Sequence, residues 1–273
     1  MLYVVSTPIG NLSDITLRAI ETLKKCDYIL CEDTRHSATL LNHYEIKKPL
    51  KSFHKFNELT KQDQIIADLN KGLNIALISD AGTPGISDPG EKLIHACIEQ
   101  NLTVTPIPGA CAAISALCCS GLDTSLFQFI GFLPKKAGEL KKTLQSVLQY
   151  DGTTICYESP NRLLEVLETL HSLDPSRKIV LAREITKIHE EFVRGSPQTL
   201  INHWNNSPQK GEVVLLISKN PNNTTPDWEH LTPEEHVQQI QSTYGASKQE
   251  AIVICAKIRG VSKRDIYNII NRD

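Results

Sequence analysis

Short runs of β-branched and aliphatic residues alternate with longer amphipathic stretches from residue 2 to about residue 107. The short runs are predicted to be strands buried on both faces, because they contain no polar alternation, and the longer stretches carry apolar residues at helical spacing. This order predicts a mostly parallel sheet with helices on both sides, whose ligands bind at the carboxyl ends of the strands. The predicted strands are Leu2–Val5, Tyr28–Cys31, Ile75–Ile78 and Thr103–Ile107, and the predicted helices are Asp14–Lys25, Thr34–His43, Leu59–Lys71 and Gly90–Glu99.

A second alternating region begins near Pro108 and Gly109. We therefore predict an N-terminal α/β domain over residues 1–110 and a second α/β domain over residues 111–219, with the binding cleft between them. The second domain is predicted to contain a helix ending at Cys119, strands at Phe127–Gly131, Thr153–Tyr157, Ile179–Ala182, Phe192–Val193 and Glu212–Ile217, a basic helix from Lys135, and a helix over Leu163–Leu170.

Residues 220–227 contain only turn and breaker residues, which predicts a linker before a helical module at residues 226–273. Its predicted helices are Pro233–Thr243, Lys248–Arg259 and Lys263–Asn271, with Ser247 and Ser262 as N-caps, a spacing that resembles a helix-turn-helix. Residues 245–272 hold six Lys and Arg against two Asp and Glu. This pattern is compatible with a solvated helical cap and with a nucleic-acid-binding surface.

The composition is that of a globular protein with a substantial core. The chain has 273 residues, of which 40% are hydrophobic, and a net charge of −2. That charge gives no whole-chain attraction to nucleic acid, so any RNA contact has to come from local basic patches. The N-terminus lacks a basic segment and no apolar run approaches ~18 residues, from which we expect a cytoplasmic protein without a membrane partner.

The eight cysteines and nine histidines do not form a metal pattern. Most of the cysteines lie in apolar runs, as buried free thiols do. There is neither a CxxC pair nor HxxxH spacing, so no metal site is predicted.

The most informative segment is Ser79–Gly90, which follows a predicted buried strand and contains three glycines and two prolines. Such a rigid, irregular loop lets a ligand approach the backbone closely. Asp80 is placed to accept hydrogen bonds or to lie near a cation, and Gly82 and Gly85 are expected to expose peptide groups. The structural alternative is an elaborate turn in which Asp80 caps its own backbone.

Two other loops narrow the choice of ligand. Ser6–Asn11, after the first strand, is not a GxGxxG dinucleotide loop, and no GxxxxGK[ST] phosphate loop occurs. Pro106–Ala113 places small residues at a predicted helix start, whose N–H groups suit a carboxylate or a ring nitrogen. Small residues also serve helix–sheet packing, so this second loop is not decisive.

Six motifs occur in order along the first four fifths of the chain. They are Thr-Pro-Ile-Gly-Asn-Leu at 7–12, Glu-Asp-Thr-Arg at 32–35, Ser-Asp-Ala-Gly-Thr-Pro-Gly-Ile-Ser-Asp-Pro-Gly at 79–90, Gly-Phe-Leu-Pro at 131–134, Tyr-Glu-Ser-Pro at 157–160 and Arg-Glu-Ile-Thr-Lys at 183–187. From residue 2 to about residue 218 the chain therefore resembles the ribosomal RNA small subunit methyltransferase I family of the tetrapyrrole methylase-like superfamily. The segment from Gly245 to Asn268 also resembles the C-terminal helical extension of that family.

The resemblance implies two α/β domains of tetrapyrrole methylase-like fold with a cleft between them, plus the small C-terminal helical module. It implies a methyltransferase, usually a homodimer, that binds S-adenosylmethionine in this cleft and methylates the 2′-OH of a cytidine in the decoding region of small-subunit ribosomal RNA. The implied cofactor residues are Pro8, Asp80, Ala81, Gly82, Gly85, Cys111, Ala112, Tyr157, Glu158 and Gly195.

The chain departs from the family pattern at two positions. Asn161 follows Tyr-Glu-Ser-Pro where the family has His, and Asn cannot take a proton at neutral pH. Phe56 lies in a segment where the family tends to have a second His, and its ring suits stacking on a base.

Methyl transfer from a sulfonium needs mainly alignment and partial desolvation, so a strong base is optional. Each candidate base also has a structural alternative: Glu32 or Asp33 as a helix cap, or Glu184 paired with a nearby cation. The unranked candidates are His54, Glu58, Asp33, Glu32 and Glu184.

Basic residues around the cleft are candidates for RNA phosphates, although charged runs are often only solvated faces. Two rival functions remain: a methyltransferase of the same fold that acts on a corrin precursor or a protein side chain, and a noncatalytic RNA-binding assembly protein. The candidate substrate residues are Arg35, Lys135, Lys136, Arg162, Arg183 and Lys187, with Lys141 and Lys142 beside them.

Overall fold

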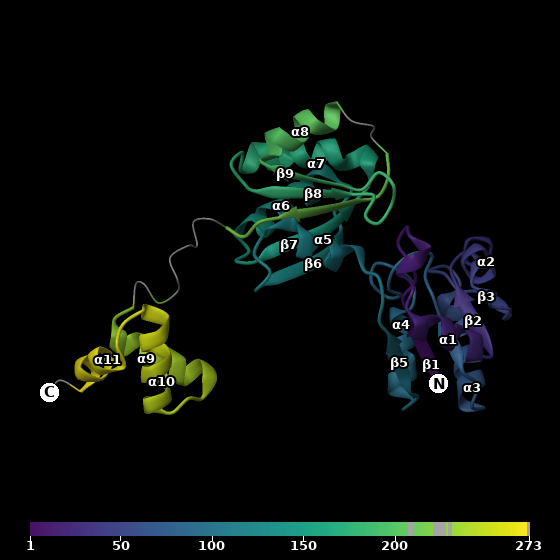
Figure 1. The fold of residues 1–273 in the computed structure, drawn as a ribbon, viewed down its shortest axis with the longest axis horizontal. Helices are drawn as coiled ribbons and strands as arrows, with labels where there is room; N and C mark the ends of the chain where they lie inside the picture. The colour runs from purple at the N-terminus through teal and green to yellow at the C-terminus, as the bar shows by residue number, and fades with distance from the viewer. Residues whose placement is uncertain (207–209, 221–227, 229–230, 272–273) are drawn as a thin grey trace. The chain divides into compact units, whose positions relative to one another are not determined.

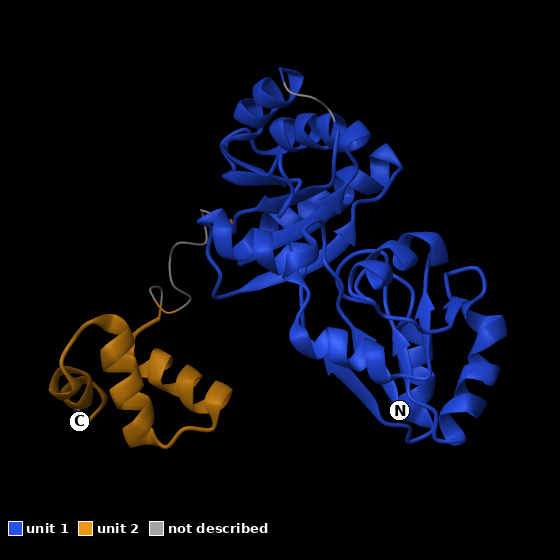
Figure 2. Ribbon diagram, turned by 45° about the vertical axis from the view of Figure 1, so that its right-hand side comes forward, with its two compact units in different colours: residues 1–219 blue, residues 220–273 orange. Residues whose placement is uncertain are grey.

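The computed structural model describes residues 1–206, 210–220, 228 and 231–271. Contacts divide the chain into two compact units, Met1–Lys219 and Asn220–Asp273 (Figure 2). The first unit holds two five-stranded sheets. Because they belong to one compact unit, a domain division between residues 110 and 111 stays a prediction. The predicted linker beyond residue 220 and the boundary at residue 226 lie outside the described residues.

The first sheet is parallel throughout, as the alternation predicts (Figure 1). Its strand order is β3-β2-β4-β1-β5. The edge strand β3 was not predicted, because its three residues Leu-Lys-Ser form no apolar run. The strands are β1 (Leu2–Val5), β2 (Tyr28–Cys31), β3 (Leu50–Ser52), β4 (Ile75–Leu77) and β5 (Val104–Ile107).

Helices cover both faces of this sheet and form a separate hydrophobic cluster on each. α1 and α2 bury Leu23 and Leu41 on one face, while α3 and α4 bury Ile65 and Leu93 on the other. The predicted doubly covered sheet is therefore confirmed. The helices are α1 (Leu17–Lys25, after the 3-10 turn η1 at Leu12–Asp14), α2 (Thr34–His43), α3 (Glu58–Asn70) and α4 (Glu91–Glu99).

The second sheet is mixed and has the order β6-β7-β10-β8-β9. Only β6 and β7 pair in parallel; the other neighbours are antiparallel. Its strands are β6 (Phe127–Phe132), β7 (Thr153–Glu158), β8 (Ile179–Arg183), β9 (Glu191–Gly195) and β10 (Val213–Ile217).

α5 (Ala112–Ser120) packs on one face of the second sheet, and α6, α7 and α8 bury apolar residues on the other. α6 (Ala137–Gln149) begins two residues later than predicted, and Lys136 is its N-cap. α7 (Pro160–Leu173) packs beside α8 (Pro197–Asn205), which was not predicted although it buries Trp204 completely.

The described part of the second unit contains α9 (Pro233–Tyr244), α10 (Lys248–Arg259) and α11 (Lys263–Ile270). The predicted caps are confirmed, since Ser247 and Ser262 each form a capping box. The three helices bury their own core around Val237, Ile252 and Ile266.

Arg259, on α10, connects that helix to α9 and to the residues that precede α9. Its guanidinium donates to the carbonyls of Trp228 and Leu231 and to Nδ1 of His236. Burial and this cation lower the pKa of His236, which keeps the imidazole a neutral acceptor.

The eight cysteines are all free thiols. Five of them are buried, as their position in apolar runs predicts, whereas Cys118 and Cys119 are exposed on α5. Among the described residues, no helix is long and apolar enough to cross a membrane.

Candidate functional site

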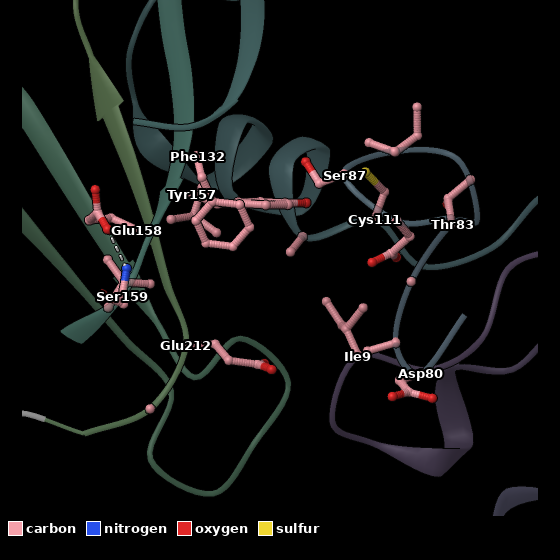
Figure 3. A pocket seen from close by; sticks show the side chains of 18 of the residues that line it. Ile9, Asp80, Thr83, Ser87, Cys111, Phe132, Tyr157, Glu158, Ser159 and Glu212 are labelled. Carbon is pink, nitrogen blue, oxygen red and sulfur yellow. Dashed lines mark hydrogen bonds between the residues drawn. The ribbon is translucent and has the colours of Figure 1, made fainter. Parts of the chain in front are cut away.

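A pocket of about 490 Å³ lies at the carboxyl ends of β1, β2, β4 and β5, as expected for this sheet type. Figure 3 shows Ile9, Asp80 and Cys111 on one side of it, facing Tyr157 and Glu158 on the other. The second sheet thus supplies the opposite wall. The pocket brings together seven of the ten residues implied for the cofactor, namely Asp80, Ala81, Gly82, Cys111, Ala112, Tyr157 and Glu158.

The first half of the loop after β4 is tied to the loop after β1. Thr7 and Gly82 form an isolated antiparallel bridge, in which the Thr7 N–H donates to the Gly82 carbonyl at 2.8 Å and the Gly82 N–H donates back at 3.1 Å. The expectation that Gly82 exposes its peptide groups is therefore wrong. Gly82 is needed for its φ of +81°, a left-handed conformation that costs glycine little.

The second half of this loop is held by α3 and by the turn that precedes it. Lys55 Nζ donates to the Ser87 carbonyl at 3.4 Å, and the Gly90 N–H donates to Glu58 Oε1 at 3.3 Å. Ser87 has a φ of +66°, which a non-glycine residue keeps only when its surroundings hold it. The backbone of Asp88, which lies between these anchors and lines the pocket, is therefore restrained.

Five carboxylates line the pocket, and the described lining contains neither Lys nor Arg. Two of them have cationic neighbours: Glu158 pairs with Arg162 at 3.2 Å, and Glu212 pairs with Lys187 at 2.9 Å. The three others have no lysine or arginine nitrogen within salt-bridge distance among the described residues, and they are Glu32, Asp80 and Asp88.

The surroundings of Asp88 disfavour its charged form. Burial raises the pKa of its carboxyl to about 6, and the negative charges of Glu32 and Asp80 add to this effect. A hydrogen bond from Ser79 and the charge of Lys55 act in the opposite direction. The pocket is therefore a place where negative charge is poorly compensated.

The opposite wall is aromatic. The Tyr157 ring packs edge-on against Phe129 and Phe132, with centroids 4.9 and 5.7 Å away. Burial in this wall raises the pKa of Tyr157 to about 12, so the hydroxyl stays protonated. Phe132 remains 61% exposed at the pocket, which leaves its ring available to a ligand.

Most candidate bases have structural partners. Asp33 caps α2 and pairs with Arg35, and its hydrogen bonds from Arg35 lower its pKa. Glu58 is buried against the Gly90 N–H. Of the five candidates, only Glu32 lines the pocket.

Glu184 and His54 also lie outside the lining. Glu184 accepts from Lys187 and from the Glu212 N–H, both at 2.9 Å; although burial opposes it, these bonds lower its pKa. His54 Nε2 lies 3.1 Å from the Asn57 amide, and its buried Nδ1 has no hydrogen-bond partner.

The candidate substrate cations fall into two groups. Arg162 donates to the Leu133 and Pro134 carbonyls as well as to Glu158, Arg183 pairs with Glu191 at 2.5 Å, and Lys187 pairs with Glu184, so all three are used internally. The exposed cations are Arg35, Lys135 and Lys136, with Lys141 and Lys142 on α6.

Three cofactor candidates lie outside the lining. Pro8 and Gly85 flank residues that line it. Gly195 pairs with Ile179, at the far end of the sheet from Val213, because β9 runs antiparallel to β8. The structure does not bring Gly195 to this pocket.

Asp88 and Glu212 line the pocket but were not singled out from the sequence. Asp88 lies within the glycine-rich loop motif, so its position in the motif was the available signal. Glu212 carried no signal, because only folding brings it into the same pocket as the Ser79–Gly90 loop. Among the described residues, no group of three or more metal-ligating side chains has the geometry of a metal site.

Comparison with known proteins identifies the family. Residues 1–201 match the tetrapyrrole (corrin/porphyrin) methylases. A Halalkalibacterium halodurans protein named ribosomal RNA small subunit methyltransferase I is 45% identical, over 100% of this chain and 95% of its own length. A Hydrogenobaculum protein of the same name is 48% identical over 221 residues, which are 80% of this chain and 95% of that protein.

The fold is also found in a solved structure, uroporphyrin-III C-methyltransferase from Thermus thermophilus in complex with S-adenosylhomocysteine. The TM-score is 0.57 at 14% identity, over 80% of this chain and 96% of the other. By the match of its first 201 residues and by its near full-length relatives, this chain belongs to the ribosomal RNA small subunit methyltransferase I family, within the tetrapyrrole methylases.

Proposed function

We propose that this protein is an S-adenosylmethionine-dependent methyltransferase that methylates the ribose 2′-oxygen of a cytidine in small-subunit ribosomal RNA. Family membership supports the methyltransferase activity, and the names of the relatives support the RNA substrate. The 2′-oxygen and the cytidine follow from the motif resemblance alone.

The observation that carries the cofactor assignment is the charge of the pocket. S-adenosylmethionine bears a sulfonium cation, and this pocket presents carboxylates with no lysine or arginine in its described lining. A cavity of about 490 Å³ is in the range of small-molecule sites. A Cβ added at Gly82 would lie 3.4 Å from Cγ2 of Ile9, so a larger side chain there would press on the pocket wall.

The cofactor, when bound, supplies a methyl group that is already activated for displacement. The protein's contribution is then alignment. Asp80, Ala81 and Cys111 would hold the donor from the first sheet, and the Tyr157 wall would exclude water from its other side. Glu32 is the candidate that lies close enough to the pocket to take the proton of the attacking hydroxyl.

RNA would be held by exposed groups outside this acidic pocket, since phosphates are repelled by carboxylates. On the first unit these are Arg35, Lys135 and Lys136, with the 96% exposed Phe56 as a stacking surface. On the second unit, α11 exposes Lys263, Arg264 and Tyr267. Cations and an aromatic ring on one short helix suit phosphate and base contacts.

The rival substrates are a corrin precursor and a protein side chain, and the proposal extends to a cytoplasmic homodimer. The test is incubation of the full chain with undermethylated small subunits and methyl-labelled S-adenosylmethionine, followed by nucleoside analysis. We expect the label in 2′-O-methylcytidine. Label on a base atom would overturn the ribose assignment, and absence of transfer to RNA would favour the rivals. Sedimentation of the purified protein tests the dimer.

A further inference from the structure

Asp88 has a role that neither the family resemblance nor the proposed mechanism assigns. It lines the pocket, but unlike Glu158 and Glu212 it has no cation within salt-bridge distance. Its backbone cannot easily move away, because Ser87 is held by Lys55 on one side and Gly90 is held by Glu58 on the other. Asp88 is thus a carboxylic acid on a restrained backbone segment that lines a small-molecule cavity.

The charged and titratable groups around Asp88 come from several elements. Glu32 follows β2, Asp80 follows β4, Lys55 precedes α3, and Tyr157 lies on β7 of the opposite wall. The two acids destabilise the Asp88 carboxylate and Lys55 stabilises it, while Tyr157 is uncharged at neutral pH. Two acids and one lysine therefore surround the Asp88 carboxylate, and a bound cation would interact favourably with this excess of negative charge.

Methyl transfer removes a positive charge from the pocket. The hydroxyl oxygen forms a bond to the methyl carbon, the carbon–sulfur bond breaks, and its electron pair stays on sulfur. The sulfonium becomes a neutral thioether, and the hydroxyl proton passes to the candidate base Glu32 and from there to solvent. Donor and product therefore differ by one methyl group and by one charge, and a nearby carboxylate interacts more favourably with the charged form.

We propose that Asp88 is a specificity-determining residue that favours the charged methyl donor over its uncharged demethylated product. This inference rests on the proposed function, because it requires the donor to bind in this pocket. A site that selects by charge helps the spent cofactor to leave, since the reaction itself removes the favourable interaction.

The proposal predicts a proton linkage. The raised pKa of Asp88, about 6, means that the carboxyl is partly protonated at mildly acidic pH. A bound cation lowers that pKa, so donor binding near that pH releases a proton, whereas product binding does not. Donor affinity accordingly rises with pH through this range, and product affinity stays flat.

Isothermal titration calorimetry of the full chain tests this with three ligands: S-adenosylmethionine, S-adenosylhomocysteine and sinefungin, a stable analogue with a cationic amine in place of the sulfonium. At about pH 7.5, Asp88→Asn should weaken the two cationic ligands roughly tenfold and the neutral product by less than about twofold. Glu91→Gln, which removes an exposed carboxylate outside this pocket, should change none of the three affinities.

The native protein supplies a second, independent measurement. Titrations at about pH 6 in two buffers of different ionisation enthalpy should show release of roughly half a proton with sinefungin and none with the product. This experiment does not depend on the folding of any variant.

The outcomes separate the two proposals. If the native protein binds none of the three ligands, the proposed function fails. If it binds them but Asp88→Asn weakens charged and neutral ligands equally, or if no proton is released, the inference about Asp88 fails alone. A variant that keeps both affinities but loses turnover would make Asp88 a base instead, which also overturns the inference.

Discussion

The two units of this protein differ in the structural roles of their polar and conformationally constrained residues. In the first, conformationally constrained residues such as Gly82 and Ser87 shape a pocket, and polar groups are spent on holding loops. In the second, the polar groups close the helices themselves, through capping boxes and Arg259, and cations remain exposed on α11. The comparison indicates that the first unit is built around a binding pocket, whereas the second is built to display a charged helix surface.

One of the relatives supports this separation. The aligned 221 residues use 95% of the Hydrogenobaculum protein, so that protein is too short to contain counterparts of both units. The aligned share, 80% of this chain, equals the share formed by residues 1–219. We therefore expect the second unit to add substrate affinity and not chemistry.

The largest effect is expected in the pocket loop. Gly82→Val forces a β-branched residue to a φ of +81° and presses its side chain towards Ile9. Cofactor affinity should fall roughly 100-fold, measured by calorimetry. The matched control is Gly72→Val, which has a φ of +88° but no heavy atom within 4 Å of the added Cβ. Equal loss of binding in both variants would contradict a local effect.

In the second unit the largest effect is expected from Arg259→Ala, which leaves the carbonyls of Trp228 and Leu231 without their donor. We expect this unit to lose about 2–3 kcal/mol of stability. Hydrogen exchange over α9 to α11 measures it. Lys257→Ala, an exposed change on the same helix, is the control. Faster exchange throughout the first unit as well would contradict the independence of the two units.

Truncation after Lys219 should raise KM for small ribosomal subunits roughly tenfold and leave kcat unchanged, since the binding energy that is lost acts equally in the ground state and the transition state. Steady-state methylation assays provide both constants. A large fall in kcat, or any loss of cofactor binding, would show that the second unit takes part in the chemistry.

The smallest effect is expected from reversing the two cations of α11. Lys263→Glu with Arg264→Glu should reduce the slope of log affinity for RNA against log salt by about 2. The control pair is Lys24→Glu with Lys25→Glu, on exposed positions of α1. An unchanged slope in the first pair would leave the basic face as a solvated surface.

Sequence reasoning located most elements because their local patterns agree with their final environment. Leu2–Val5, Thr34–His43 and Lys248–Arg259 are found with the predicted bounds. The failures are also physical. β3 is a short edge strand without an apolar run, and α8 was missed although it buries Trp204. β3 lacks such a run and depends on its pairing with β2, which no local pattern records.

The candidate site divides in the same way. The loop Ser79–Gly90 could be singled out from its glycines and prolines, since these residues restrict the backbone wherever they occur. The roles of single polar residues could not. Glu58 looked like a base and is a loop anchor, Arg183 looked like a phosphate contact and is buried against Glu191, and Glu212 was unnoticed.

The positions of most strands and helices and of the irregular loop can be predicted from the amino-acid order alone, because periodicity and backbone preference act over a few residues. Which charges are compensated depends on the folded arrangement. Glu212 meets Lys187 across 25 positions, and Asp88 meets Glu32 across 56, while Asp88 keeps no salt-bridge partner among the described residues. Electrostatic energies depend on distance and desolvation, and both arise only when remote segments pack together.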